Sequence, residues 1–98
     1  DMKEGFAAHL ILMPHKQVRS AIVLVDECGI LREIRALDRE TPFTRFYDGA
    51  IRVVKRDADP ANPGDDPLVG DPVAIWQLYP YDLHAQQQLP NTRTLRIF

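Results

Sequence analysis

The fold of this chain is decided by the stretch VRSAIVLVD, residues Val18 to Asp26. Its centre is β-branched, at Ile22, Val23 and Val25, which favours an extended backbone. Apolar residues occupy both of its faces, which indicates a strand in the interior of a sheet. The residues ECG that follow predict a tight turn, since Gly29 supplies the positive φ that a short hairpin requires.

The segment after this turn, residues 30–37, carries two signals. Ile30, Ile34 and Leu37 have helical spacing, but the preceding turn favours a strand that pairs back on the first one, and we predict a strand. Residues 81–88 predict a short helix or a wide turn, because Pro80 and Pro90 are each expected to stop an element. Further strands are predicted at 6–12, 43–47, 50–54, 73–79 and 92–97.

Between the two blocks of strands lies a segment, residues 55–71, that we call the junction. It contains three prolines, two glycines and five aspartates, a composition that predicts no regular element. Loops of this length are uncommon inside compact domains and are typically functional or disordered.

The predicted fold is all-β. A chain of 98 residues supports one modest core, and short strands with turn signals at regular spacing indicate a β-sandwich or a partial barrel. We therefore predict a single domain over residues 1–98, in which the strand blocks 6–54 and 73–97 share one core and the junction joins them.

Composition excludes several classes of function. The formal net charge of −2 gives no electrostatic footprint for nucleic acid. The longest apolar run, Ala21 to Val25, is far too short to span a bilayer. Cys28 is the only cysteine, so no internal disulfide can form, which fits a cytoplasmic protein. We expect neither a nucleic-acid nor a membrane partner.

The order of these segments resembles the small β domain of the amidohydrolase superfamily of metal-dependent hydrolases. Residues Ala21 to Ile34, AIVLVDECGILREI, are similar to a hairpin of that domain, and Phe46 to Ile51, FYDGAI, is similar to the lead-in to the family's TIM-type barrel. Residues Leu89 to Ile97, LPNTRTLRI, resemble the segment that returns from the barrel to close the first sheet. The resemblance implies a composite β domain in which the junction stands in place of the barrel.

One departure from the family pattern bears on activity. Amidohydrolases bind their metal through a His-x-His motif just after the lead-in, whereas here the lead-in continues as VVKRD, from Val53 to Asp57, without a histidine. No metal ligand of the family can be carried over to this chain. We therefore predict no catalytic residue, no metal and no cofactor, and we do not expect an independent enzyme.

The other reactive side chains favour structural interpretations. His9 lies in an apolar strand, where a core or edge histidine is the commoner case, and His15 and His84 lack the spacing of converging metal ligands. Cys28 follows two acidic residues, which disfavour a reactive thiolate. The junction offers oxygen ligands whose spacing differs from that of the helix-flanked calcium loop, so we prefer a solvated loop: Asp57, Asp59, Asn62, Asp65 and Asp66.

Trp76, Tyr79 and Tyr81 form the predicted interaction patch. Aromatic residues in an apolar strand are more often core residues, but exposed ones mark interfaces. Loss of a barrel would also leave an apolar face that needs a partner. We therefore predict a non-catalytic interaction or structural module that binds a second copy or another protein. One alternative is an accessory subunit that completes, in trans, an amidohydrolase acting on carbon–nitrogen bonds. The other is a remnant of such an enzyme without selected activity.

Overall fold

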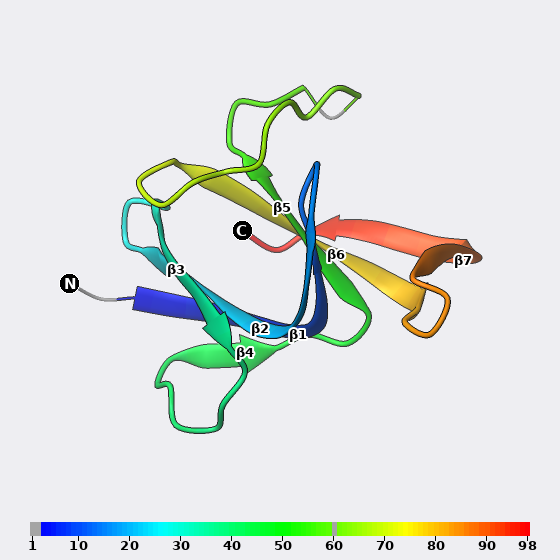
Figure 1. Cartoon of the computed structure of the whole chain (residues 1–98), viewed down its shortest axis with the longest axis horizontal. Coiled ribbons are helices and arrows are strands. Elements are labelled where there is room, and N and C mark those ends of the chain that lie inside the picture. The colour runs from blue at the N-terminus through cyan, green and yellow to red at the C-terminus, as the bar shows by residue number, and fades with distance from the viewer. Residues whose placement is uncertain (1–2, 60) are drawn as a thin grey trace.

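The computed structural model describes residues 3–59 and 61–98, which form strands and loops but no helix. The all-β prediction is confirmed. The strands, shown in Figure 1, are β1 (Lys3–Leu12), β2 (Gln17–Asp26), β3 (Leu31–Ala36), β4 (Thr44–Phe46), β5 (Ala50–Lys55), β6 (Val73–Asp82) and β7 (Gln87–Arg96).

All seven strands belong to one open, mixed sheet of order β3-β2-β1-β5-β6-β7, with β4 also paired to β1. The neighbours are antiparallel except where β1 pairs with β4 and β5. The sheet curls strongly (Figure 1), and Leu31 ties the start of β3 to the end of the junction. Its backbone N–H donates to the carbonyl of Asp71, and its carbonyl accepts from the N–H of Gly70. The sequence did not decide between a β-sandwich and a partial barrel. In the structure the strands form this single curled sheet.

β1 and β2 bend together at His9 and Ser20. The pairing of the two strands is interrupted at these residues, and Ser20 has a φ of 46°. In β1 the main core contains Ala8 before the bend and Ile11 after it. Because inward residues should be two apart, the bend shifts the alternation by one residue and keeps both halves of β1 facing the same core.

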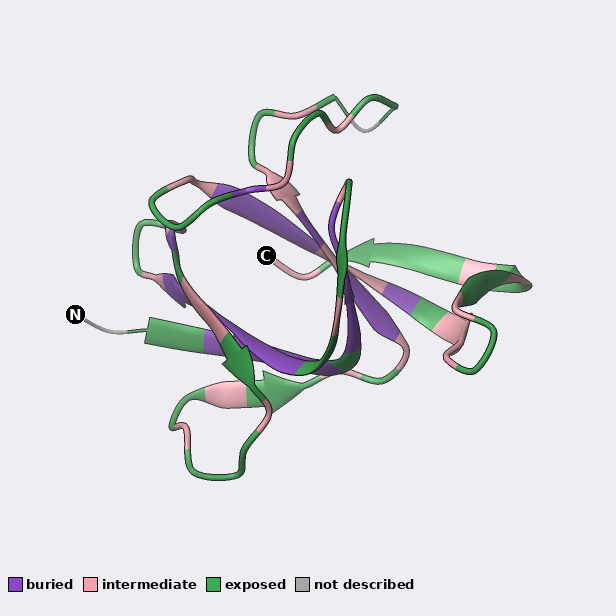
Figure 2. Ribbon diagram, viewed as in Figure 1, coloured by how far each residue is buried: buried purple, intermediate pink, exposed green. Residues whose placement is uncertain are grey.

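The largest core cluster draws on strands from both sides of the junction. Phe6, Ile51 and Ile75 belong to it, each at most 1% exposed. Ile97 and Phe98 pack against it from the C-terminal end of the chain. Figure 2 shows the buried residues concentrated along β1, β2, β5 and β6. The junction therefore connects strands that pack in one cluster, and β5 pairs directly with β6.

The central hairpin agrees with its prediction. β2 lies between β1 and β3, and residues 21–25 are buried on both faces. Gly29 has a φ of 78° in the turn that follows. Residues 31–36 form a strand, which decides between the two signals of that segment.

Two predictions about proline are wrong. β6 continues through Pro80 to Asp82, and β7 begins at Gln87 and continues past Pro90. Of the two alternatives for residues 81–88, the wide turn is observed, at 83–86. Pro80 lies where the pairing of β6 with β7 shifts register, and β7 is at the edge of the sheet. In such places a missing N–H removes no hydrogen bond that the sheet requires.

The junction has two different halves. In its described residues it contains only the end of β5, turns and one isolated bridge, between Asp59 and Asn62, while Pro60 lies outside the described residues. The first half is residues 55–64, whose described part projects from the body, and the second half is residues 65–71 (Figure 1). The second half is anchored, because the backbone N–H of His15 donates to Oδ1 of Asp66 at 2.7 Å and Pro67 is buried.

Candidate binding groove

A groove of about 580 Å³ lies on the face of β5, β6 and β7 that is turned away from the main core. Along β6, Ile75 belongs to the core while Ala74 and Trp76 line the groove, as the alternation of a strand requires. The turn after β1, at Pro14, and the first half of the junction, at Asp59, form further walls. Its volume is in the range of pockets that hold small ligands or a few side chains of a partner.

A row of three side chains crosses the floor of this groove. Arg52 of β5 is paired with Trp76 of β6, and Trp76 is paired with Arg96 of β7. All three residues line the groove. Because directly paired residues on one face are the closest neighbours in a sheet, the indole lies between two guanidinium-bearing side chains. We call Arg52, Trp76 and Arg96 the cross-strand row.

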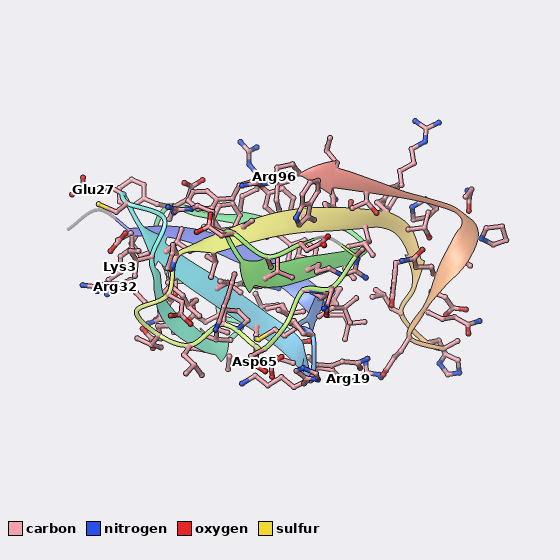
Figure 3. The ribbon with its side chains drawn as sticks, turned by 90° about the horizontal axis from the view of Figure 1, so that it is seen from above. Lys3, Arg19, Glu27, Arg32, Asp65 and Arg96 are labelled. Carbon is pink, nitrogen blue, oxygen red and sulfur yellow. The ribbon has the colours of Figure 1, made fainter. Side chains whose placement is uncertain are left out.

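Arg96 is held over the indole of Trp76. Its Cζ lies 5.3 Å from the centre of the ring, and its Nε donates to the carbonyl of Phe98. A cation–π contact at an exposed site contributes about 0.5–1 kcal/mol. The two contacts together orient the guanidinium, which Figure 3 labels at the end of β7.

The groove carries an excess of positive charge. Arg52, Arg56 and Arg96 line it against one acidic residue, Asp59. Arg56 is partly committed, because its Nη2 donates to the carbonyl of Cys28 at 2.8 Å. Within the part of the chain that the structure describes, neither Arg52 nor Arg96 forms an ion pair with a carboxylate. In the described part of the chain, the row thus presents two guanidinium groups without a carboxylate partner, and the guanidinium of Arg96 lies over the indole of Trp76.

The structure separates the three aromatic residues of the predicted patch. Trp76 and Tyr81 line the groove, and Tyr81 also packs against a small cluster that contains Leu78. Tyr79 does not line the groove; it is 54% exposed, and Gly49 lies close to its ring. The patch of the sequence prediction is therefore a two-residue part of the groove plus a separate exposed tyrosine.

Sequence reasoning did not find the arginines of the groove. Arg52 lies between buried Ile51 and Val53, and that alternation shows only that its side chain leaves the core. Its position opposite Trp76 depends on the register of β5 against β6. The position of Arg96 opposite Trp76 depends in the same way on the register of β7 against β6. Neither register can be read from residue spacing alone, so the sequence offered no signal that would bring these three residues together.

The histidines and the cysteine lie apart from the groove and from each other. His9 is exposed and contacts the ring of Phe46 edge-on, with 4.9 Å between ring centres, so the core alternative for His9 is wrong. His15 and His84 are exposed, as is Cys28. Among the described residues, no three His, Cys, Asp or Glu side chains are grouped so that they could hold a metal ion.

Comparison of this chain with protein-family models, with curated proteins and with solved structures finds no match. The described part of the chain also contains no helix that could serve as a membrane span. The interpretation of the groove therefore depends on its own chemistry.

Proposed function

We propose that this chain is a non-catalytic interaction module whose groove receives a protein partner. The observation that carries the proposal is the cross-strand row: Trp76 is partly exposed between Arg52 and Arg96, on the face of the sheet opposite the main core. Tryptophan and arginine are the residue types that most often dominate the binding energy of protein interfaces.

The resemblance to the amidohydrolase β domain supports the same proposal from the sequence. In that family the β domain packs against a catalytic barrel, and this chain has the junction where the barrel would begin. A β domain without its barrel keeps the role of a binding surface and loses the chemistry. We place the module in the cytoplasm, on the basis of its single cysteine.

The test is site-specific photo-crosslinking in the cells from which the chain comes. A benzoylphenylalanine at position 81 lies in the groove, and the same group at position 45, in β4, serves as the control. We expect a crosslinked protein at position 81 that is absent at position 45. The purified partner should bind the wild-type chain, and Trp76→Ala should weaken binding more than tenfold, as truncation of an interface hot spot does. Circular dichroism of the variant shows whether it is folded.

Two results would overturn the proposal. Equal crosslinking at both positions would show that the groove is not an interface. Stoichiometric zinc or nickel in the purified chain, together with hydrolysis of a carbon–nitrogen bond, would show an enzyme. If the crosslinked partner is itself an amidohydrolase barrel, the module contributes to an enzyme in trans, and if the partner is a second copy, the chain is a homo-oligomer.

A further inference from the structure

We infer that the partner enters the groove with an acidic segment, in which two carboxylates flank an apolar side chain. This inference rests on the proposed function and specifies the chemistry of the partner. It follows from the cross-strand row, because Arg52 and Arg96 stand on the two sides of Trp76. A guanidinium matches a carboxylate with two parallel hydrogen bonds. Trp76 is partly exposed, and the part of its indole that Arg96 leaves uncovered accepts an apolar group.

The spacing of the row indicates the spacing in the partner. Neighbouring strands are about 4.8 Å apart, so each arginine backbone lies about 5 Å from that of Trp76. In an extended segment that crosses these strands, residues i, i+2 and i+4 share one face and are about 6.8 Å apart. The long, flexible arginine side chains can cover the difference of about 2 Å on each side. The geometry therefore fits the pattern acid–x–apolar–x–acid.

Among the described residues, the acidic side chains of the chain itself do not form ion pairs with Arg52 and Arg96. Asp59 is the only acidic residue in the lining of the groove among the described residues. Asp66 is bound by the backbone of His15, and Figure 3 shows Asp65 and Arg96 on opposite sides of the molecule. A partner that brings its own carboxylates would supply the charges that the groove lacks.

The balance of charge favours an acidic peptide over a nucleic acid. A nucleic acid binds through many phosphate contacts along a broad basic surface. Here three arginines line the groove, the chain as a whole has a net charge of −2, and five aspartates lie in the adjoining junction. A short acidic segment in the groove meets only one of those aspartates, Asp59, against three arginines.

Trp76 is the only tryptophan in the chain, so its fluorescence reports directly on the groove. The probe is the acetylated and amidated pentapeptide Glu-Ser-Phe-Ser-Glu, compared with Gln-Ser-Phe-Ser-Gln and with oligothymidylate. We expect a saturable change in tryptophan fluorescence with the Glu peptide, and binding that weakens as salt is added. The Gln peptide should bind about tenfold more weakly or worse, because its hydrogen bonds are no longer charge-assisted.

Arginine substitutions inside and outside the groove test whether the Glu peptide binds there. Arg52→Gln and Arg96→Gln should each weaken the Glu peptide about tenfold, as loss of a charge-assisted contact does. Arg93→Gln is the matched control, because Arg93 is on β7 but does not line the groove, and it should bind as the wild type does. Thermal unfolding of each variant separates loss of binding from loss of fold.

Four results would overturn the inference: no binding of the Glu peptide, equal binding of the Gln peptide, an equal loss in Arg93→Gln, or tighter binding of oligothymidylate. A crosslinked partner at position 81 together with absence of peptide binding would leave the interaction module standing and refute only the acidic segment. Absence of both would refute the two proposals together.

Discussion

At the scale of single residues, Asp26 shows how one side chain organises the central hairpin. Its Oδ1 accepts the backbone N–H of Cys28 at 2.8 Å and that of Ile30 at 3.1 Å, and its Oδ2 lies 3.5 Å from Nε of Arg32. The hydrogen bond from Ile30 is the largest cause of the lowered pKa of Asp26, with further lowering by Cys28, Arg32 and Arg56. The ionised carboxylate therefore fixes the turn in which Gly29 takes its positive φ.

This arrangement predicts a pH dependence of stability. The pKa of Asp26 is below 3.8 in the folded chain and near 3.8 in the unfolded chain, so the unfolded chain binds the proton more readily. The stabilisation is therefore complete above pH 3.8 and is lost as the pH falls through the folded pKa. Asp26→Asn should be less stable than the wild type at pH 6, and the difference should shrink below pH 4.

Thermal unfolding followed by circular dichroism between pH 6 and pH 2 measures this difference. Asp65→Asn is the control, since no hydrogen bond to this loop carboxylate is found among the described residues. A difference between Asp26→Asn and the wild type that stays constant over the whole range would contradict the assignment.

At the scale of elements, β6 and β7 carry very different shares of the stability. Ile75 of β6 is fully buried in the main core, whereas Leu95 of β7 is 62% exposed. We expect Ile75→Ala to lower the free energy of unfolding by about 2–5 kcal/mol, because it removes buried methyl groups and leaves a cavity. Leu95→Ala should change it by about 0.5 kcal/mol or less. Urea denaturation measures both values, and equal losses would mean that β7 is covered in solution.

The sequence predicted the elements better than their pairing. β-branched residues and turn glycines located β2, β3 and the turn at Gly29, because these signals act over a few neighbouring residues. Proline misled the prediction of β6 and β7, since Pro80 lies at a shift in register that only the paired strand reveals. The same limit hid the groove: Trp76 was a candidate by residue type, but its two arginines come from strands whose register is set by the whole sheet.

At the scale of the whole molecule, the junction connects two strands that are already neighbours. Lys55 is paired with Val73, at the two ends of the junction, so the chain leaves and re-enters the sheet at one place. Insertions are tolerated where the two ends of a loop are close together at the surface. This is the geometry that insertion of a further domain requires.

Insertion at two points of the junction tests this geometry. Six residues of glycine and serine placed after Gly64, where the backbone is open and a side chain would meet no atom within 4 Å, should cost about 1 kcal/mol or less. The same insertion after Val69 should cost more. It separates Leu68 from Asp71, whose backbone N–H donates to the Leu68 carbonyl at 2.9 Å, and it disturbs the bond from Gly70 to Leu31.

Thermal unfolding compares the two variants with the wild type. For a chain of this size, about 1 kcal/mol corresponds to a shift of about 4–8 °C in Tm, so the first variant should stay within that range and unfold in one transition. The second should fall below it, because the start of β3 loses its connection to the end of the junction. The reverse order would mean that the first half of the junction supports the core, and position 64 would then not be the place where another domain can enter the fold.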